Sequence, residues 1–155
     1  VAPPIMTRRP YIVGNWKMHG TRAMLSEARA IDRAAQRHMK VEVALAPPYT
    51  LIHPIHREAE QIAVGAQDCH EADGGAHTGD ISAAMIADAG AKFVILGHSE
   101  RREGHGEDDA LVRAKALAAL GAGLKIILCC GEDDETRRSG EAVNFVRQQL
   151  CASLP

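Results

Sequence analysis

The sequence is poor in aromatic residues, in net charge and in long apolar runs. Trp, Tyr and Phe make up 3% of its 155 residues, so a core must be built mostly from Ala, Ile, Leu and Val. A formal net charge of −2 leaves no basic surface for nucleic acid. No apolar run approaches the roughly 18–20 residues that a membrane span requires. We therefore expect a soluble globular protein that binds neither nucleic acid nor a membrane.

The first ten residues also lack the apolar stretch of a signal peptide, because no such stretch follows Arg8 and Arg9. We expect a flexible N-terminal lead-in over residues 1–10 and a single domain over 11–155, in a cytoplasmic protein. A chain of this length suffices for one compact core, since domains commonly have about 100–200 residues.

The four cysteines match neither a CxxC pair nor a zinc-ribbon spacing. In a cytoplasmic protein such cysteines are ordinarily reduced thiols. A metal site made of Cys69, His70 and His77 is an alternative, but its spacing matches no known ligand motif. We therefore expect no bound metal.

Short apolar runs rich in β-branched residues recur along the chain, and each is followed by a helical pattern. The runs begin roughly 20 to 35 residues apart, which is the rhythm of successive βα units. They are apolar on both faces, as strands of a buried parallel sheet are. The predicted strands are 11–13, 41–45, 62–64, 93–96 and 126–128. The chain is therefore predicted to be one α/β domain of five βα units.

Between these runs, apolar residues recur with a helical period. The predicted apolar stripes are Leu25, Ala28, Ile31 and Ala35; Leu111, Ala114, Leu117 and Leu120; and Val143, Val146 and Leu150. Thr21, Thr50 and Ser82 stand where helix N-caps are expected. The longest predicted loop, 67–80, is rich in glycine, and loops of this length in compact domains are usually functional.

The run Ile-Leu-Gly-His-Ser-Glu-Arg-Arg at 95–102 places a histidine where a strand ends and a short helix begins. The helix N-terminus carries partial positive charge, which disfavours an imidazolium at His98. A neutral imidazole there can donate a hydrogen bond to a developing oxyanion. We therefore predict that His98 acts as an electrophile.

Polar residues also follow the first predicted strand, and the carboxyl ends of parallel strands share the edge where α/β folds place ligands. Lys17 can supply a fixed positive charge, Asn15 can supply a neutral donor, and Glu100 can pair with Lys17. Together with His98 they suit the polarisation of a carbonyl or the stabilisation of an enediolate. The sequence has no P-loop, no Ser-His-Asp nucleophile pattern and no G-x-G-x-x-G run after its first strand.

Several motifs carry a more specific signal. They are Val-Gly-Asn-Trp-Lys-Met at 13–18, Ala-Pro-Pro at 46–48, Gly-Ala-Gln at 65–67, Gly-Ala-His-Thr-Gly-Asp-Ile-Ser at 75–82, Gly-His-Ser-Glu-Arg-Arg at 97–102 and Cys-Cys-Gly-Glu at 129–132. In this order and spacing, the chain resembles the triosephosphate isomerase family, in register from about Arg9 to its end. That family is also the standard example of a histidine kept neutral by a helix N-terminus, so the resemblance and the motif do not support a neutral His98 independently.

The resemblance implies a (β/α)8 TIM barrel that interconverts dihydroxyacetone phosphate and D-glyceraldehyde 3-phosphate through an enediolate, in glycolysis and gluconeogenesis, with neither metal nor organic cofactor. It implies catalytic roles for His98 and Lys17, substrate binding by Asn15 and Lys17, and supporting roles for Ser99 and Glu100. It also implies a homodimer whose interface includes Gln67 and Thr78, with Thr78 close to the active site of the neighbouring subunit.

The sequence departs from the family pattern at His19, Asp68 and Cys130, away from the main catalytic positions. A complete barrel has eight strands and about 250 residues, whereas these residues provide five βα units. The strand with the family's glutamate base and the phosphate-binding loops are not among them. We therefore expect a truncated partial barrel, inactive alone, with exposed strand edges and an exposed inner face. The alternatives are a non-catalytic open-barrel module that assembles with itself or a partner, and an open doubly wound sheet.

Overall fold

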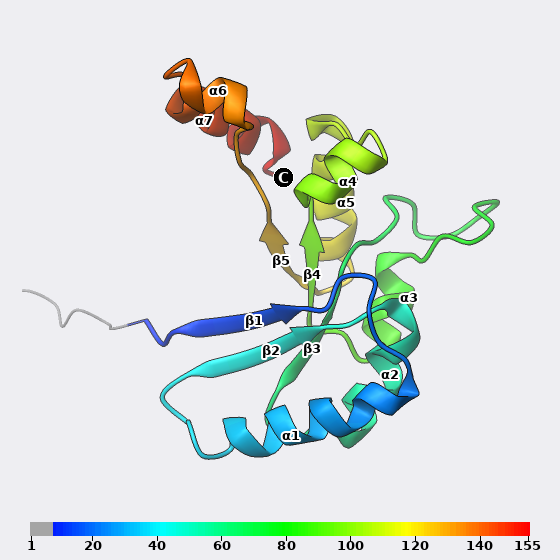
Figure 1. Cartoon of the computed structure of the whole chain (residues 1–155). Coiled ribbons are helices and arrows are strands. Elements are labelled where there is room, and N and C mark those ends of the chain that lie inside the picture. Colours follow the sequence, from blue (N-terminus) through cyan, green and yellow to red (C-terminus); the bar gives the residue numbers. More distant parts are fainter. Residues whose placement is uncertain (1–7) are drawn as a thin grey trace, which may run out of the picture.

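The computed structural model describes residues 8–155 and consists of a curled parallel sheet covered by helices on one side (Figure 1). The strands are β1 (Tyr11–Asn15), β2 (Glu42–Ala46), β3 (Ala63–Ala66), β4 (Phe93–Leu96) and β5 (Lys125–Leu128). The helices are η1 (Arg22–Met24), α1 (Leu25–Ala35), α2 (Tyr49–Glu58), α3 (Ala83–Asp88), α4 (Ser99–Gly104), α5 (Asp109–Gly121), α6 (Asp134–Arg138) and α7 (Ala142–Ser153). Most of the predicted lead-in lies outside the described residues. Within its described part, Arg9 donates a hydrogen bond to the Met39 carbonyl at 2.8 Å.

The strands follow one another in the sheet in the order β1-β2-β3-β4-β5, and every neighbouring pair is parallel. This order confirms the partial TIM barrel, because a doubly wound sheet would show a reversal of strand order. All five predicted strands are present, and 93–96 has the predicted bounds. The other four begin or end one or two residues away from the prediction.

Side chains alternate between the two faces of the sheet, as strand geometry requires. On β4, Val94 and Leu96 belong to the large core under the helices, whereas Phe93 and Ile95 belong to a smaller core on the concave face. Sheet curvature also brings Tyr11 of β1 to Phe93 of β4 in an edge-to-face contact with ring centroids 6.3 Å apart. The prediction of an exposed inner face was therefore wrong for Phe93 and Ile95, which are buried because the curled strands pack their side chains together.

The helix predictions were correct in part. On α1, Ala28 and Ala35 are buried as expected. On α5, however, Leu117 and Leu120 are 54% and 48% exposed, and the buried face is formed by Val112, Lys115, Ala116 and Ala119. The predicted stripe was wrong because a spacing of three residues drifts around a helix of 3.6 residues per turn, so positions 111 and 120 point to opposite sides.

The remaining predictions concern α7 and the caps. Val146 and Leu150 are partly buried but Val143 is exposed, because α7 packs mainly against α5 and α6 rather than on the sheet. Ser82 caps α3 and accepts a hydrogen bond from the Met85 N–H. Thr21 precedes η1 but makes no side-chain cap bond. Thr50 lies inside α2, whose N-cap is Pro48.

Among the helices of residues 8–155, none has the length and apolar character that a membrane span requires.

Candidate active site

An open pocket of about 320 Å³ lies at the carboxyl ends of the strands. Asn15 ends β1, Lys17 follows it, and His98 and Glu100 stand at the start of α4, directly after β4. These four predicted site residues all line the pocket, together with Gln67 from the segment after β3. The parallel topology therefore brings together side chains that are far apart in the sequence, such as Lys17 and Glu100, which are separated by 83 positions.

Lys17 adopts a backbone conformation that is unusual for a residue with a side chain, with φ at 53°. Two side chains hold it there. Its N–H donates to Oδ1 of Asn15 at 2.9 Å, and its carbonyl accepts from Nε2 of Gln67 at 2.8 Å. Gln67 Nε2 also donates to the Ala46 carbonyl at 2.8 Å, which ties the turn to the end of β2. Asn15 and Gln67 thus fix the direction in which the Lys17 side chain leaves the rim.

The Lys17 ammonium forms an ion pair with Glu100, with Nζ 2.5 Å from Oε1. The pairing agrees with the prediction made from the sequence. The hydrogen bond from Lys17 lowers the pKa of Glu100, so its carboxyl is ionised at neutral pH. Glu100 holds the cation of Lys17 beside the pocket.

His98 is the N-cap of α4, and its Nδ1 accepts a hydrogen bond from the Glu100 N–H at 3.2 Å. An Nδ1 that accepts a hydrogen bond carries no proton, so the proton of the neutral ring is on Nε2. Nε2 is then a hydrogen-bond donor available to a ligand. His98 also lines the pocket, and its electrophilic role stays a prediction.

Two other predicted site residues, Ser99 and Thr78, do not line this pocket. Ser99 is exposed and lines a neighbouring pocket with Cys129, Gly131 and Glu132 instead of the pocket that contains Lys17. Thr78 is exposed on the long segment between β3 and α3. The amide of Gln67 is engaged within its own chain. The dimer-interface roles of Gln67 and Thr78 stay predictions.

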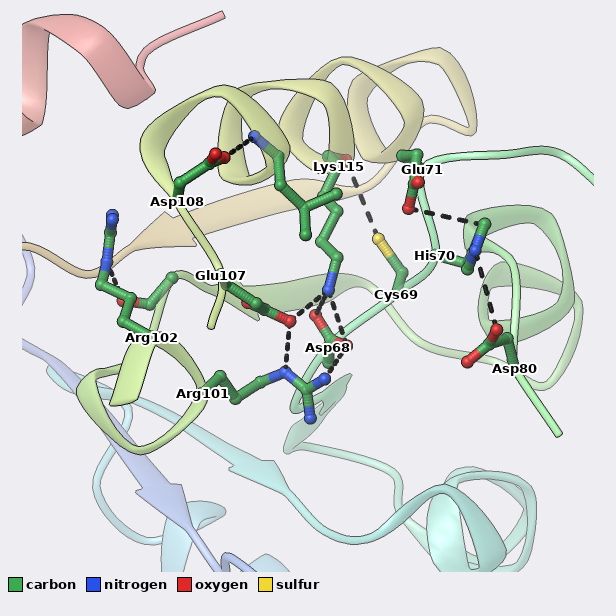
Figure 2. A network of polar contacts seen from close by, with 12 residues as sticks. Asp68, Cys69, His70, Glu71, Asp80, Arg101, Arg102, Glu107, Asp108 and Lys115 are labelled. Carbon is green, nitrogen blue, oxygen red and sulfur yellow. Dashed lines mark hydrogen bonds and ion pairs between the residues drawn. The ribbon is translucent and has the colours of Figure 1, made fainter. Parts of the chain in front are cut away.

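A buried ion network lies behind the pocket, and the sequence patterns did not point to it (Figure 2). Lys115 of α5 lies between two carboxylates, with Nζ 3.0 Å from Oδ1 of Asp68 and in direct contact with Oε1 of Glu107. Arg101 of α4 closes the ring, 2.9 Å from Oδ2 of Asp68 and 2.8 Å from Oε1 of Glu107. Asp68 and Arg101 also line the pocket, so the network supports its wall.

The two carboxyl groups of this network have opposite pKa shifts. Burial raises the pKa of Asp68 in spite of the nearby Lys115 and Arg101. Burial acts in the same direction on Glu107, but hydrogen bonds from Lys115 and Arg101 outweigh it and lower the pKa of that carboxyl. Lys115 and Arg101 each contact both carboxyl groups.

Cys69, His70 and His77, the metal ligands considered from the sequence, do not form a cluster that could share an ion. Burial raises the pKa of Cys69 to about 12, and its thiol donates to the Lys115 carbonyl, so Cys69 is a protonated structural thiol. Among residues 8–155, His70, His77 and Asp80 form the one cluster with ligand atoms close enough to share an ion. The Ala72 N–H, however, donates to Nδ1 of His70 at 2.9 Å, which puts the proton of the neutral ring on Nε2. The Nε2 that faces Asp80 therefore has no free lone pair for a metal.

Comparison with known proteins gives a consistent result. The family model for triosephosphate isomerase matches residues 10–155. A triosephosphate isomerase of Caulobacter vibrioides is 51% identical over 152 residues, which are 96% of this chain and 60% of the relative. The corresponding protein of Rhizobium etli is 49% identical over 151 residues, covering 95% of this chain and 59% of the relative.

The crystal structure of triosephosphate isomerase from Bartonella henselae superposes with a TM-score of 0.91 at 46% identity. The match covers 96% of this chain and 62% of that structure. The chain thus spans about 60% of the length of the relatives that it matches.

Proposed function

The chain belongs to the triosephosphate isomerase family, and on that premise we propose that it supplies the electrophilic part of an aldose–ketose isomerase site. The substrates are dihydroxyacetone phosphate and D-glyceraldehyde 3-phosphate, interconverted through an enediolate in glycolysis and gluconeogenesis, in the cytoplasm. The observation that carries the proposal is the convergence of Asn15, Lys17 and His98 on one pocket, with Nδ1 of His98 occupied by a backbone N–H.

Each of the three residues has a distinct task in this proposal. The Nε2–H of His98 donates to the substrate oxygen that becomes an oxyanion, which stabilises the enediolate most where the negative charge develops. The Lys17 ammonium, held by Glu100, supplies positive potential beside the same oxygen. Asn15 fixes the Lys17 turn and lines the substrate site.

The base that moves the proton is not supplied by the carboxylates at this rim. Hydrogen bonding from Lys17 lowers the pKa of Glu100. The backbone N–H of Glu132 and the side chain of Arg137 lower the pKa of Glu132. Both carboxylates are also paired with cations, Glu100 with Lys17 and Glu132 with Arg137, so neither is free to abstract a proton from carbon. We therefore propose that the 155 residues alone are inactive and that activity requires the family's glutamate and phosphate-binding loops.

We also propose that the active protein is a homodimer. The exposed Thr78 and the Gly-rich segment around it would contact the partner, with Gln67 at the base of the same segment. Substitution of Thr78 by Arg in the active protein is expected to convert the dimer into a monomer, as measured by sedimentation velocity. An unchanged dimer would remove Thr78 from the interface.

The test joins the 155 residues to the C-terminal 40% or so of the Caulobacter vibrioides relative, the part that the chain does not match, and measures turnover of D-glyceraldehyde 3-phosphate. The joined protein is expected to be active and the 155 residues alone inactive. His98→Gln is expected to lower kcat about 100- to 1000-fold, the usual loss for one oxyanion donor. Lys17→Ala should also abolish most of the activity.

Matched controls separate these effects from general damage. His38→Gln and Lys40→Ala change exposed residues after α1, away from the pocket, and should leave turnover unchanged. A joined protein that folds but does not turn over substrate would contradict the isomerase proposal and favour the open-barrel assembly module.

A further inference from the structure

Arg102 of α4 connects four separate parts of the chain through one guanidinium. Its Nε donates to the Gly97 carbonyl at 2.7 Å, and its Nη2 donates to the Cys129 carbonyl at 3.3 Å. Its Nη1 donates to Oδ1 of Asp109 at 2.7 Å, and Nη2 also donates to Oγ of Ser153 at 3.1 Å. The ends of β4 and β5 are thereby joined to the start of α5 and to the last turn of α7. Figure 2 shows Arg102 beside the ion network of Arg101 but outside it.

The Arg102 side chain is held in a fixed position by its surroundings. The Arg102 side chain is only 13% exposed. Ser153 is fully buried, and its hydroxyl donates to the same Asp109 oxygen at 2.9 Å, so the acceptor and the hydroxyl are themselves fixed. Asp109 and Ser153 therefore hold the guanidinium in one orientation.

Arg102 binds the carbonyl of Gly97, the residue immediately before His98. Gly97 has φ at 67°, a conformation that favours glycine, and its backbone lies directly against the guanidinium. A Cβ added there would lie 2.8 Å from Nη2 of Arg102 and 3.0 Å from Cγ1 of Val112. The carbonyl that Arg102 binds belongs to the peptide that carries the His98 nitrogen, so this contact fixes the backbone from which the imidazole extends.

Arg102 does not line the pocket that contains Lys17 and His98, so it makes no direct contact with a ligand there. An arginine is required because its planar fork presents donors in several fixed directions, whereas a lysine offers donors from a single point. A lysine at this position keeps the charge but cannot serve the carbonyls of Gly97 and Cys129 and the groups of Asp109 and Ser153 together.

We propose that Arg102 is a positioning residue for His98: by clamping the Gly97 carbonyl, it holds the imidazole with Nδ1 on the Glu100 N–H and Nε2–H directed at the substrate. The proposal rests on the isomerase function proposed above, and its spectroscopic test is independent of turnover.

The test uses the joined protein with 15N-labelled histidine, in which the His98 ring signal is identified by its loss in His98→Gln. The parent protein is expected to show a single neutral tautomer with the proton on Nε2. Arg102→Met and the conservative Arg102→Lys should both replace it by an exchange-broadened mixture of tautomers. Ser153→Ala weakens the same network but leaves the Gly97 contact, so it should lower stability without changing the His98 signal. Arg29→Met breaks an exposed ion pair between α1 and α2 and should change neither the stability nor the His98 signal.

Kinetics give the second readout. Displacing a catalytic group by about 1 Å can cost about 100-fold, so both Arg102 variants are expected to lower kcat 10- to 100-fold with little change in KM. An unchanged His98 tautomer in folded Arg102→Lys protein would overturn the proposal, whatever its stability. If the unsubstituted joined protein is inactive, the isomerase proposal fails, and the tautomer comparison still decides the role of Arg102.

Discussion

At the scale of single residues, the site depends on the strained backbone of Lys17. A non-glycine residue in the left-handed region costs about 1–3 kcal/mol and persists only where its surroundings hold it. Gln67 holds this backbone in place, because its Nε2 donates hydrogen bonds to the carbonyls of both Lys17 and Ala46. The position of the site's cation is therefore set by an amide from a different βα unit.

Replacing Gln67 by Met should release this turn. We expect the free energy of unfolding, measured by urea titration of the joined protein, to fall by about 1–3 kcal/mol, because two carbonyls lose their donor. Turnover should fall with it, since the Lys17 ammonium loses its fixed place. Gln148→Met on the exposed face of α7 is the control and should change stability by less than about 0.5 kcal/mol. Equal losses in the two variants would show that the Gln67 amide does not hold the turn.

Sequence reasoning located the rim residues but not the contacts that hold them. Asn15, Lys17, His98 and Glu100 were predicted at one edge because strand ends in a parallel sheet converge whatever the side-chain packing. The ion network of Lys115 could not be predicted in this way, because it depends on how α4 and α5 rotate against the segment after β3. The buried face of α5 was misplaced for a different reason, because a stripe with a spacing of three residues was given more weight than helix geometry allows.

At the scale of elements, α1 is tied to the start of β3 by one buried carboxylate. Oδ1 of Asp32 accepts from the N–H groups of Gln61 and Ile62 at 2.8 and 2.9 Å, and Oδ2 accepts from Glu60 at 3.2 Å. Burial acts to raise the pKa of Asp32, but the hydrogen bonds from these backbone donors outweigh burial. The pKa of Asp32 is therefore below its ordinary value. The ionised carboxylate thus fixes where the third strand begins.

Asp32→Asn should therefore be destabilising in a pH-dependent way. Because the pKa of Asp32 is lower in the folded state than in the unfolded state, its stabilisation is complete above the unfolded value of about 3.9 and is lost as the pH falls through the folded value. We expect a loss of about 1.5–3 kcal/mol at pH 7, the usual worth of hydrogen bonds to a charged group, shrinking below about pH 4. Urea titrations at pH 7, 5 and 3 would show it. The exposed Asp73→Asn is the control, and a loss that stays constant down to pH 3 would rule out the ionised carboxylate as its source.

A second constraint at this scale joins β3 to β4. A Cβ on Gly65 would overlap the ring of Phe93, which is buried on the concave face. Gly65→Ala is expected to cost about 1–3 kcal/mol of stability through overpacking. Adding Phe93→Leu should recover part of that cost, which a double-mutant cycle measures. Gly74→Ala meets no atom within 4 Å and should be neutral; independent, additive effects at 65 and 93 would contradict the clash.

At the scale of the whole molecule, the described sheet has two strands with a neighbour on one side only, β1 and β5. Figure 1 shows α1, α2, α3 and α5 on the outer side of the curled sheet. Unpaired strand edges recruit other strands. Tyr11 and Ile12 add exposed apolar surface along β1. The 155 residues expressed alone are therefore expected to associate through their edges.

Sedimentation velocity of the isolated 155 residues tests this expectation. The average mass should rise with concentration, and Ile12→Lys should shift it toward the monomer, because a charge on an edge strand opposes strand pairing. Met39→Lys is a matched control, since Met39 is 57% exposed against 58% for Ile12 but lies outside the strands. If Met39→Lys suppressed association as strongly as Ile12→Lys, general surface charge would be responsible. Joining the C-terminal part of the relative should abolish association through the edges, both in the unsubstituted protein and in Met39→Lys. In the joined protein, β1 and β5 would each gain a neighbouring strand and close the barrel.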